Sequence, residues 1–157
     1  MDYFKQHGLS DGTRIMEVGC GWGLTGIYCA KKHGAIVTSV DIDSEVFPYV
    51  HLHAKLNKVE VSTLHKGFDG LRGKHLKNID VLIGADICFW DSMVDTLRKL
   101  ILRALRSGVQ SVIIADPVRS TFEEISEYFA KKGKAQILEW STRRPYHIEG
   151  RILEVKA

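Results

Sequence analysis

Three glycines at alternate positions are the first candidates for binding a ligand. Gly19, Gly21 and Gly23 stand between a short strand-like run and a segment with helical spacing. Because glycine has no Cβ atom, such a loop can turn tightly and bring its backbone against a bound molecule. Gly26, one helical turn later, would let the following helix pack closely against a sheet. The segment Gly21–Gly26 also fits the G-x-G-x-x-G pattern of dinucleotide-binding loops, so the spacing alone predicts a ligand site without selecting the ligand.

Glu17, two residues before the loop, favours a cationic ligand over a pyrophosphate. At about 5 Å and an effective dielectric constant near 20, each pair of like charges costs roughly 3 kcal/mol. S-adenosylmethionine carries an ammonium and a sulfonium group and no phosphate, so Glu17 suits this ligand and disfavours NAD. Asp41, 20 residues after Gly21, could accept hydrogen bonds from the ribose hydroxyls of either ligand and does not discriminate between them.

Strand-like and helix-like segments alternate along most of the chain, and they must position these residues. Runs rich in β-branched residues predict strands at 14–19, 35–41, 61–65, 79–86, 111–116, 135–140 and 151–155. Apolar residues at helical spacing predict helices at 24–33, 44–57, 92–106 and 120–133. Gly34 predicts a left-handed cap for the first helix, Pro48 must lie in the first turn of the second, and Ser120–Glu123 predicts a capping box for the last.

This alternation predicts a mostly parallel sheet with helices on both faces. The last two strands have only the polar segment Arg143–His147 between them, so they should pair as an antiparallel hairpin. Ligands of open α/β sheets bind beyond the carboxyl ends of the strands. We therefore expect carboxylates to gather at that edge, because the first five expected strands end near Glu17, Asp41, Asp69, Asp86 and Asp116.

Length and composition indicate a single globular domain over residues 1–157. Hydrophobic residues make up 45% of the chain and charged residues 26%, which excludes a disordered or fibrous protein. The net charge of +3 is spread without a Lys/Arg run longer than two, short of the basic stripe expected of a nucleic-acid-binding protein. The histidines and cysteines show no metal-ligand spacing, so we expect no metal.

A cytoplasmic location is expected from the apolar pattern and from the cysteines. The chain lacks a run of about 18 apolar residues that could span a membrane. The first residues lack the basic start and apolar middle of a secretory signal. Cys20, Cys29 and Cys88 are odd in number and widely spaced, which fits free thiols in a reducing compartment.

The segment from Met16 to Ile27, M-E-V-G-C-G-W-G-L-T-G-I, resembles the first motif of class I, seven-strand S-adenosylmethionine-dependent methyltransferases. The expected order of strands and helices matches that family along nearly the whole chain. Asp86-Ile87-Cys88-Phe89 is similar to the D-x-x-Y/F signature of the subgroup that includes protein-lysine and nicotinamide N-methyltransferases. The resemblance implies a Rossmann-like, doubly wound α/β sheet of seven strands in the order 3-2-1-4-5-7-6, with the hairpin at one edge.

The resemblance also implies a role for each candidate residue in binding S-adenosylmethionine and its product S-adenosylhomocysteine. The glycine loop would lie along the methionine part, with Glu17 supporting the loop. Asp41 would bind the ribose hydroxyls, and Ile42 would pack on the adenine ring. The other residues expected to line the cofactor are Cys20 within the loop, Phe68 and Asp69 at the adenine edge, and Ala85 and Asp86 at the methyl end.

The implied reaction is a direct in-line transfer of a methyl group to a nitrogen atom of a lysine-like protein side chain or of a small amine. Such a transfer needs alignment and a dry site and no nucleophilic side chain. Asp86 would orient the amine, and Phe89 and Trp90 would hold its cationic centre through cation–π contacts of about 0.5–2 kcal/mol. Because lysine has a pKa of about 10.4 and a neighbouring carboxylate raises it, removal of the proton is left to solvent.

Alternatives exist for the whole chain and for single residues. An NAD(P)-linked oxidoreductase would need a separate substrate domain, and no residues are left to build one. A catalytically silent domain could keep this fold for protein binding. Asp41 and Asp86 could simply cap helices, and Phe68 and Phe89 could be core aromatics. The family usually has a longer segment before its first strand than the 13 residues that precede Arg14, so the cover over the site is either minimal or incomplete.

Overall fold

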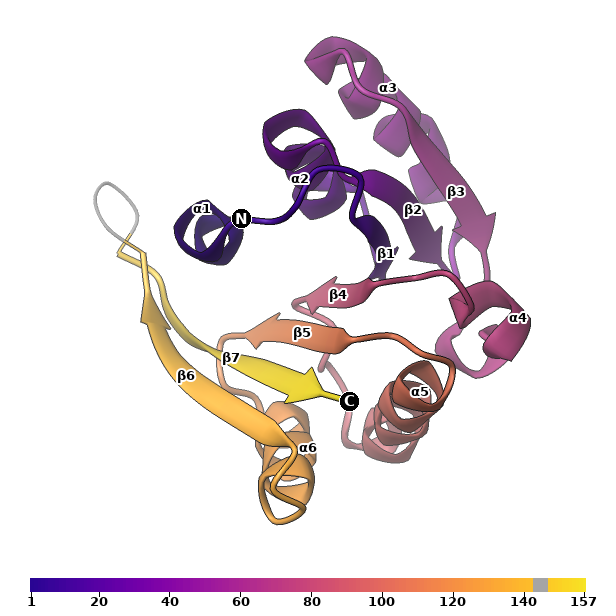
Figure 1. Ribbon diagram of the computed structural model, residues 1–157. Coiled ribbons are helices and arrows are strands. Elements are labelled where there is room, and N and C mark those ends of the chain that lie inside the picture. Colours follow the sequence, from indigo (N-terminus) through magenta and orange to yellow (C-terminus); the bar gives the residue numbers. More distant parts are fainter. Residues whose placement is uncertain (143–146) are drawn as a thin grey trace.

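The computed structural model of this protein describes residues 1–142 and 147–157. Its seven strands form one sheet in the order β3-β2-β1-β4-β5-β7-β6 (Figure 1). Strands β1 to β5 run parallel, whereas β7 lies antiparallel between β5 and β6. The predicted strand order and terminal hairpin are confirmed, and residues 143–146 of the predicted connection lie outside the described residues. The strands are β1 (Arg14–Val18), β2 (Ile36–Asp41), β3 (Val61–His65), β4 (Val81–Ala85), β5 (Ser111–Asp116), β6 (Ala135–Ser141) and β7 (Glu149–Lys156).

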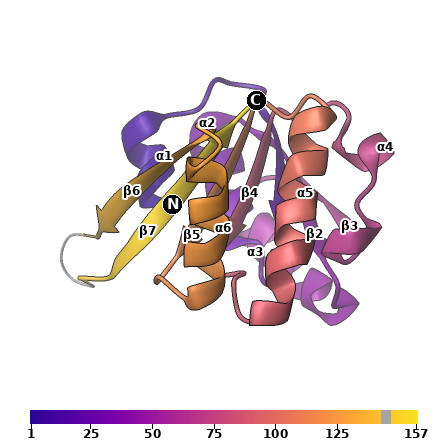
Figure 2. The same ribbon diagram turned by 90° about the horizontal axis from the view of Figure 1, so that it is seen from below.

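Helices cover both faces of the sheet, as Figures 1 and 2 show. One face carries α1 (Asp2–His7), α2 (Leu24–His33) and α3 (Phe47–Asn57), and the other carries α4 (Gly73–Leu76), α5 (Val94–Arg106) and α6 (Ser120–Ala130). Short 3-10 helices follow the carboxyl ends of three strands, namely η1 (Ser44–Val46), η2 (Phe68–Gly70) and η3 (Asp91–Met93). None of the helices in the described residues combines the length and the hydropathy of a transmembrane segment.

Alternate side chains of the central strands enter two separate hydrophobic layers, because successive residues of a strand point to opposite faces. Ile15 and Ile83 belong to the layer that contains residues of α1 and α2. Met16 and Leu82 belong to the layer that contains residues of α5 and α6. Each of these four side chains is at most 2% exposed. The central strands are therefore buried on both faces, as their nearly continuous apolar character predicts.

Helix α5 fixes the segment that follows β4 by burying one apolar stripe. Leu97, Leu100, Ile101 and Ala104 recur three or four residues apart, and each is at most 1% exposed. This spacing places all four on one side of the helix. The chain then leaves the helix through Gly108, whose φ is +96°, a conformation that glycine adopts readily.

Three predicted helices differ from the structure at their ends. Segments 44–46 and 91–93 are 3-10 turns that precede α3 and α5, and α6 ends at Ala130 rather than three residues later. The last turn of a periodic segment is where sequence patterns are least informative. The predicted cap at Gly34 is confirmed, with φ +65°, and so is the position of Pro48 in the first turn of α3.

The capping box predicted at Ser120–Glu123 is wrong. The N-cap of α6 is Arg119, and its side chain does not bond to the helix amides. The Ser120 hydroxyl instead donates to a carboxylate oxygen of Asp91 in η3, at 2.8 Å. The hydroxyl that the local pattern assigns to the helix cap therefore makes a tertiary contact instead. This contact connects α6 to the segment after β4.

Helix α1 is an element that the sequence analysis did not predict. Its six residues are too few to show a helical repeat. Tyr3 and Phe4 are nevertheless buried, and the Tyr3 ring lies 5.6 Å, centroid to centroid, from the ring of Trp140 in β6. Packing against the sheet therefore holds this short helix beside the strands of the terminal hairpin.

Candidate functional site

The loop between β1 and α2 has the backbone that its glycines predict. Gly19, Gly21 and Gly23 have φ values of +60°, +50° and +72°, a region that residues with a Cβ rarely adopt. Gly19 also has no room for a side chain, because an added Cβ would lie 2.7 Å from Cγ2 of Ile87. At Gly21, by contrast, no atom of the described residues lies within 4 Å of that position apart from Gly21 and its two chain neighbours. The loop therefore presents bare backbone with free space beside it.

Asp41, at the end of β2, is attached to this loop. One carboxylate oxygen accepts a hydrogen bond from the Gly21 amide at 2.9 Å, and the other accepts from the Asp43 amide at 3.0 Å. Asp43, not Asp41, caps the next helical turn by accepting from the Glu45 amide. Ile42 beside it is 74% exposed. A carboxylate next to an exposed apolar side chain suits a nucleoside, whose ribose donates hydrogen bonds and whose base is flat.

Glu17 is buried beneath the loop and is only 5% exposed. The Ser39 hydroxyl donates to its carboxylate at 3.4 Å, and the nearby backbone amides of Thr25 and Gly26 also favour its charged form. Burial raises the pKa of Glu17 to about 7 despite these donors. An added Cβ on Gly26 would lie 2.7 Å from Oε2 of Glu17, so the predicted close packing at Gly26 is confirmed. Glu17 thus supports the first turn of α2, where the helix dipole favours a carboxylate.

The other residues predicted around the loop differ in their exposure. Cys20 is buried, and burial together with nearby carboxylates raises the pKa of its thiol to about 12. Phe68 in η2 packs partly against the core, with its ring edge 3.6 Å from the position of a Cβ on Gly19. Asp69, the next residue, is exposed. Phe68 is therefore a core aromatic that also borders the glycine loop, and Asp69 lies at the surface.

A second group of residues meets where β4 and β5 end. The Arg119 guanidinium donates to the carboxylate of Asp86 and, at 2.9 Å, to Oδ2 of Asp116. It also lies over the ring of Phe89, with its central carbon 4.7 Å from the ring centroid. The side chain of Asp116 is fully buried, whereas that of Asp86 is 60% exposed. The structure thus brings Asp86 and Phe89 together around one cation, and it leaves the next residue, Trp90, exposed.

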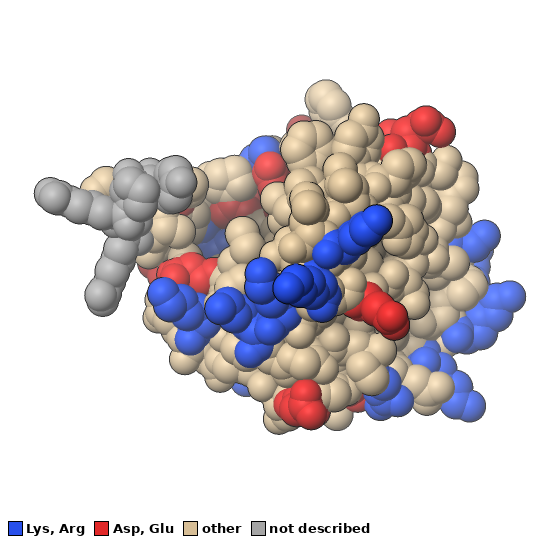
Figure 3. Space-filling view, turned by 90° about the horizontal axis from the view of Figure 1, so that it is seen from above, with Lys and Arg blue, Asp and Glu red and all other residues tan. Residues whose placement is uncertain are grey.

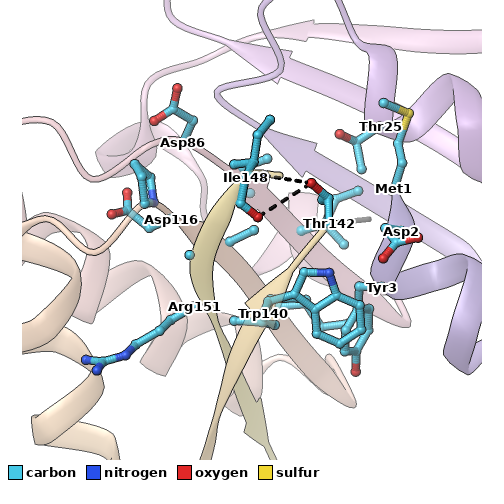
Figure 4. A pocket seen from close by; sticks show the side chains of 18 of the residues that line it. Met1, Asp2, Tyr3, Thr25, Asp86, Asp116, Trp140, Thr142, Ile148 and Arg151 are labelled. Carbon is cyan, nitrogen blue, oxygen red and sulfur yellow. Dashed lines mark hydrogen bonds between the residues drawn. The ribbon is translucent and has the colours of Figure 1, made fainter. Parts of the chain in front are cut away.

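A cavity of about 390 Å³ opens beside this cluster, on the face of the sheet that carries α1. Figure 4 shows Asp86 and Asp116 on one side of the cavity and Thr25 on the other. Of the predicted site residues, Glu17, Ala85 and Asp86 line it, and the loop glycines do not. Because Glu17 and Thr25 belong to the loop region as well, they connect the cavity to the glycine loop.

Among the charged residues that line this mostly apolar cavity, acidic residues outnumber basic ones. Five carboxylates line it, against two arginines and the Met1 amino group among the described residues. Arg151 is already paired with Glu139 at 2.7 Å, and Arg119 is held by the cluster described above. Such a lining favours a cationic or amine-bearing occupant over an anion. The carboxylates are those of Asp2, Glu17, Asp86, Asp116 and Glu149.

Arg119 is a candidate functional residue that the sequence analysis missed. It occupies the N-cap position of α6, where the helix dipole disfavours a cation. A positive charge at this unfavourable position, three residues after Asp116, is a signal that carboxylates hold it. Trp140 of β6 also lines the cavity, and no sequence pattern indicates this, because its position beside α1 depends on the strand order.

The face that carries α1, α2 and α3 shows a band of basic side chains with carboxylates on both sides (Figure 3). Lysines occupy the last turns of these helices, including Lys5, Lys31 and Lys55. Basic residues at helix C-termini complement the helix dipole. These lysines therefore have a local explanation and add no separate indication of a nucleic-acid partner.

Comparison with known sequences gives a consistent class of relatives. A family model described as lysine methyltransferase matches residues 2–144. A ribosomal protein L11 methyltransferase from Acetivibrio thermocellus is 39% identical over 59 residues, which are 38% of this chain and 19% of that protein. An electron transfer flavoprotein beta subunit lysine methyltransferase from Danio rerio is 23% identical over 116 residues, 74% of this chain and 44% of that protein. The chain thus spans less than half the length of these curated relatives.

Comparison with solved structures addresses the fold. A methyltransferase from Pyrococcus furiosus superposes with a TM-score of 0.73 at 17% sequence identity, over 99% of this chain and 80% of that chain. This likeness confirms the predicted Rossmann-like, seven-stranded architecture. The relatives described here are all methyltransferases, so they give no support to an NAD(P)-linked oxidoreductase.

Proposed function

The chain belongs to the lysine methyltransferase family, whose methyl donor is S-adenosylmethionine, and we propose that it methylates a nitrogen atom of a lysine-like protein side chain. The observation that carries this choice is the acidic cavity beside Asp86, where two carboxylates and an aromatic ring already surround a cation. A site of this composition favours a protonatable amine over an anionic acceptor. A small amine is the other acceptor that fits these groups.

The donor would bind along the glycine loop and the end of β2. The space beside Gly21 would take its methionine part, and Glu17 would support the loop from below. Asp41 keeps acceptor capacity for ribose hydroxyls, because a carboxylate has about four lone-pair sites and only two are used by backbone amides. Ile42 would offer its exposed surface to adenine. The remaining proposed contacts are with Gly19, Cys20, Gly23, Phe68, Asp69 and Ala85.

The chain's own residues would mainly align and shield the reactants. S-adenosylmethionine, when bound, supplies a methyl group that is already activated on a sulfonium, so no nucleophilic side chain is required. Asp86 would orient the acceptor nitrogen through its N–H groups. Phe89 and Trp90 would flank the acceptor with aromatic surface, and the apolar lining of the cavity would exclude water.

Two of the relatives favour a protein acceptor over a small amine. Both curated relatives described above are named as methyltransferases that act on proteins. A lysine side chain has a long flexible stem that can enter a cavity while the rest of its protein stays outside. The lysine-like side chain is therefore the acceptor that we propose.

Isothermal titration with S-adenosylhomocysteine tests the donor half of the proposal, with NAD and NADP as parallel controls. We expect saturable binding of S-adenosylhomocysteine alone, and binding of NAD in its place would overturn the proposal. The acceptor half is tested with a labelled methyl donor and lysine-containing peptides, compared with the same peptides after acetylation of their lysines. Label should enter only the unmodified peptides, and equal labelling of both sets would exclude lysine.

A further inference from the structure

Arg119 makes contacts that the proposed function leaves unexplained. Its guanidinium touches Asp86 and the ring of Phe89, the two groups proposed above to receive the acceptor amine. It also donates to Asp116 at 2.9 Å, and the Arg119 amide donates to the other oxygen of Asp116 at 2.8 Å. A cation of the chain itself therefore occupies contacts that suit a cation of the acceptor.

The backbone on both sides of this contact is held in an uncommon conformation. Asp86 has a φ of +60°, and Val118, directly before Arg119, has a φ of +74°. Positive φ is rare for residues other than glycine, and for a β-branched residue such as Val118 it is an outlier. The Asp86 amide donates to the Ala115 carbonyl at 2.8 Å, which ties the turn after β4 to β5. Strain of this kind persists where surrounding contacts over-determine it, often at functional sites.

An acceptor amine meets two opposing requirements at Asp86. A carboxylate orients the nitrogen by accepting from its N–H groups, yet the same negative charge stabilises the ammonium form, which has no lone pair to donate. A second cation on the carboxylate opposes this stabilisation through a Coulomb interaction of opposite sign. Arg119 lies in that position and shares its single positive charge between Asp86 and Asp116, so part of the charge of Asp86 is already compensated.

We propose that Arg119 is a positioning residue that prevents Asp86 from holding the acceptor amine as an ammonium ion. This inference rests on the proposed function, because it requires an amine acceptor at Asp86. Asp86 then acts mainly by orienting the amine. The site binds the neutral amine nearly as tightly as the ammonium form. Arg119 itself stays anchored by the buried carboxylate of Asp116.

The other charged groups nearby leave this role to Arg119. Asp91 of η3 accepts from Ser120 of α6, and the buried Cys88 thiol behind Asp86 stays neutral because burial raises its pKa to about 12. Arg151 of β7 is paired with carboxylates of β6 and α6, at 2.7 and 3.4 Å. Among the described residues, Arg119 is thus the cation paired with Asp86. The other charged groups that line the cavity are the Met1 amino group, Asp2, Glu17, Asp116 and Glu149.

The test compares two probes of equal length that differ in charge, n-butylammonium and n-butanol. Their affinities for the protein saturated with S-adenosylhomocysteine are measured at pH 7 by NMR titration of the amide signals of cavity residues. The measured quantity is the charge selectivity, the dissociation constant of butanol divided by that of butylammonium. The proteins compared are the wild type, Arg119→Gln, Arg119→Lys and the double variant Asp86→Asn/Arg119→Gln.

We expect Arg119→Gln to raise the charge selectivity about tenfold, because it exposes the charge of Asp86 and the face of Phe89. Arg119→Lys should keep the wild-type value, since it restores the cation. The double variant should show a clearly smaller gain, because, of the two carboxylates paired with Arg119, only the charge of Asp116 then remains to attract the ammonium ion. An unchanged selectivity in Arg119→Gln, an equally large gain without Asp86, or no binding of butylammonium to any of the proteins would each overturn the proposal.

Two further measurements distinguish a failure of the proposed function, a failure of this inference and the unfolding of a variant. If the wild type fails to bind S-adenosylhomocysteine, the proposed function fails; if it binds and the selectivity does not respond to Arg119, only this inference fails. Arg119→Gln leaves the buried Asp116 without its cation and could unfold. In that event Asp116→Asn/Arg119→Gln is compared with Asp116→Asn, and the same rise in selectivity is expected because Asp86 again loses its partner.

Discussion

Asp41 and Gly21 are joined by a hydrogen bond of 2.9 Å from the Gly21 amide to Oδ2 of Asp41. Strands β1 and β2 are parallel neighbours in the sheet, so the loop after one lies beside the carboxyl end of the other. The hydrogen bond fixes the carboxylate next to the bare loop backbone. The 20-residue spacing is thus a property of the strand–helix–strand unit itself, which explains why it fits both a dinucleotide and S-adenosylmethionine.

Replacing Asp41 by Ala should weaken binding of S-adenosylhomocysteine. The substitution removes the proposed ribose acceptor and the anchor of the Gly21 amide. Hydrogen bonds to a charged group contribute about 1.5–3 kcal/mol, so we expect the dissociation constant to rise by roughly tenfold to a hundredfold in isothermal titration. Glu45→Ala, an exposed carboxylate in the adjacent turn, is the matched control and should bind normally. Unchanged affinity in Asp41→Ala would remove this residue from the donor site.

The buried carboxyl group of Glu17 should make stability depend on pH. Burial raises its pKa in the folded protein to about 7, above the ordinary value of 4.5. The folded state therefore favours the protonated form, and its full stability is present below about pH 4.5 and falls as the pH rises towards 7. Complete ionisation costs about 3 kcal/mol for this difference in pKa.

Glu17→Gln isolates this contribution, because its amide oxygen can still accept from the Ser39 hydroxyl but the side chain cannot ionise. Urea unfolding of the two proteins is measured at several pH values between about 4.5 and 7.5. We expect the unfolding free energy of the wild type, relative to the variant, to fall by about 3 kcal/mol over this range. A difference that stays constant with pH would show that Glu17 does not titrate there.

The sheet and the glycine loop could be predicted because short sequence patterns determine them. Apolar β-branched runs encode buried strands, and a turn with three left-handed residues calls for glycine at those positions. The position of Glu17 could be predicted as well, because it stands two residues before Gly19 and must therefore lie beside the loop. The fold and the proposed donor side of the site were therefore accessible without coordinates.

The acceptor side could not be predicted because it depends on contacts between distant segments. Arg119 and Asp86 are 33 residues apart and meet only once β4 and β5 are paired. The cavity likewise needs α1 and the hairpin strands to lie over the same part of the sheet. Helix α1 is too short for a periodic signal, and it is held by burial of Tyr3 and Phe4 rather than by helix propensity.

Gly26→Ala should destabilise the protein through overpacking. An added Cβ would lie 2.7 Å both from Oε2 of Glu17 and from Cγ1 of Val37 in β2, and neither buried neighbour can move freely. Such overpacking costs about 1–3 kcal/mol, measured as a lower midpoint of urea unfolding. Gly73→Ala in α4 is the control, because its Cβ would meet only the Ser107 hydroxyl, at 3.5 Å. Equal midpoints for the two variants would contradict the close approach of α2 to the sheet.

Asp86→Asn should separate binding of the methyl donor from methyl transfer. Asp86 lines the proposed acceptor cavity and Asp41 does not, so the affinity for S-adenosylhomocysteine should stay within about twofold. Transfer to the lysine peptide that labels best should fall by up to about tenfold, because Asn replaces one of the two oxygens that can orient the acceptor nitrogen with a donor, and a lost hydrogen bond costs about 0.5–1.5 kcal/mol. Glu127→Gln, an exposed carboxylate on α6 paired with Lys131, controls for the loss of a negative charge and should transfer normally. If Asp86→Asn lost its affinity for S-adenosylhomocysteine in proportion to its activity, Asp86 would belong to the donor site and the acceptor would have to be oriented by other residues of the cavity.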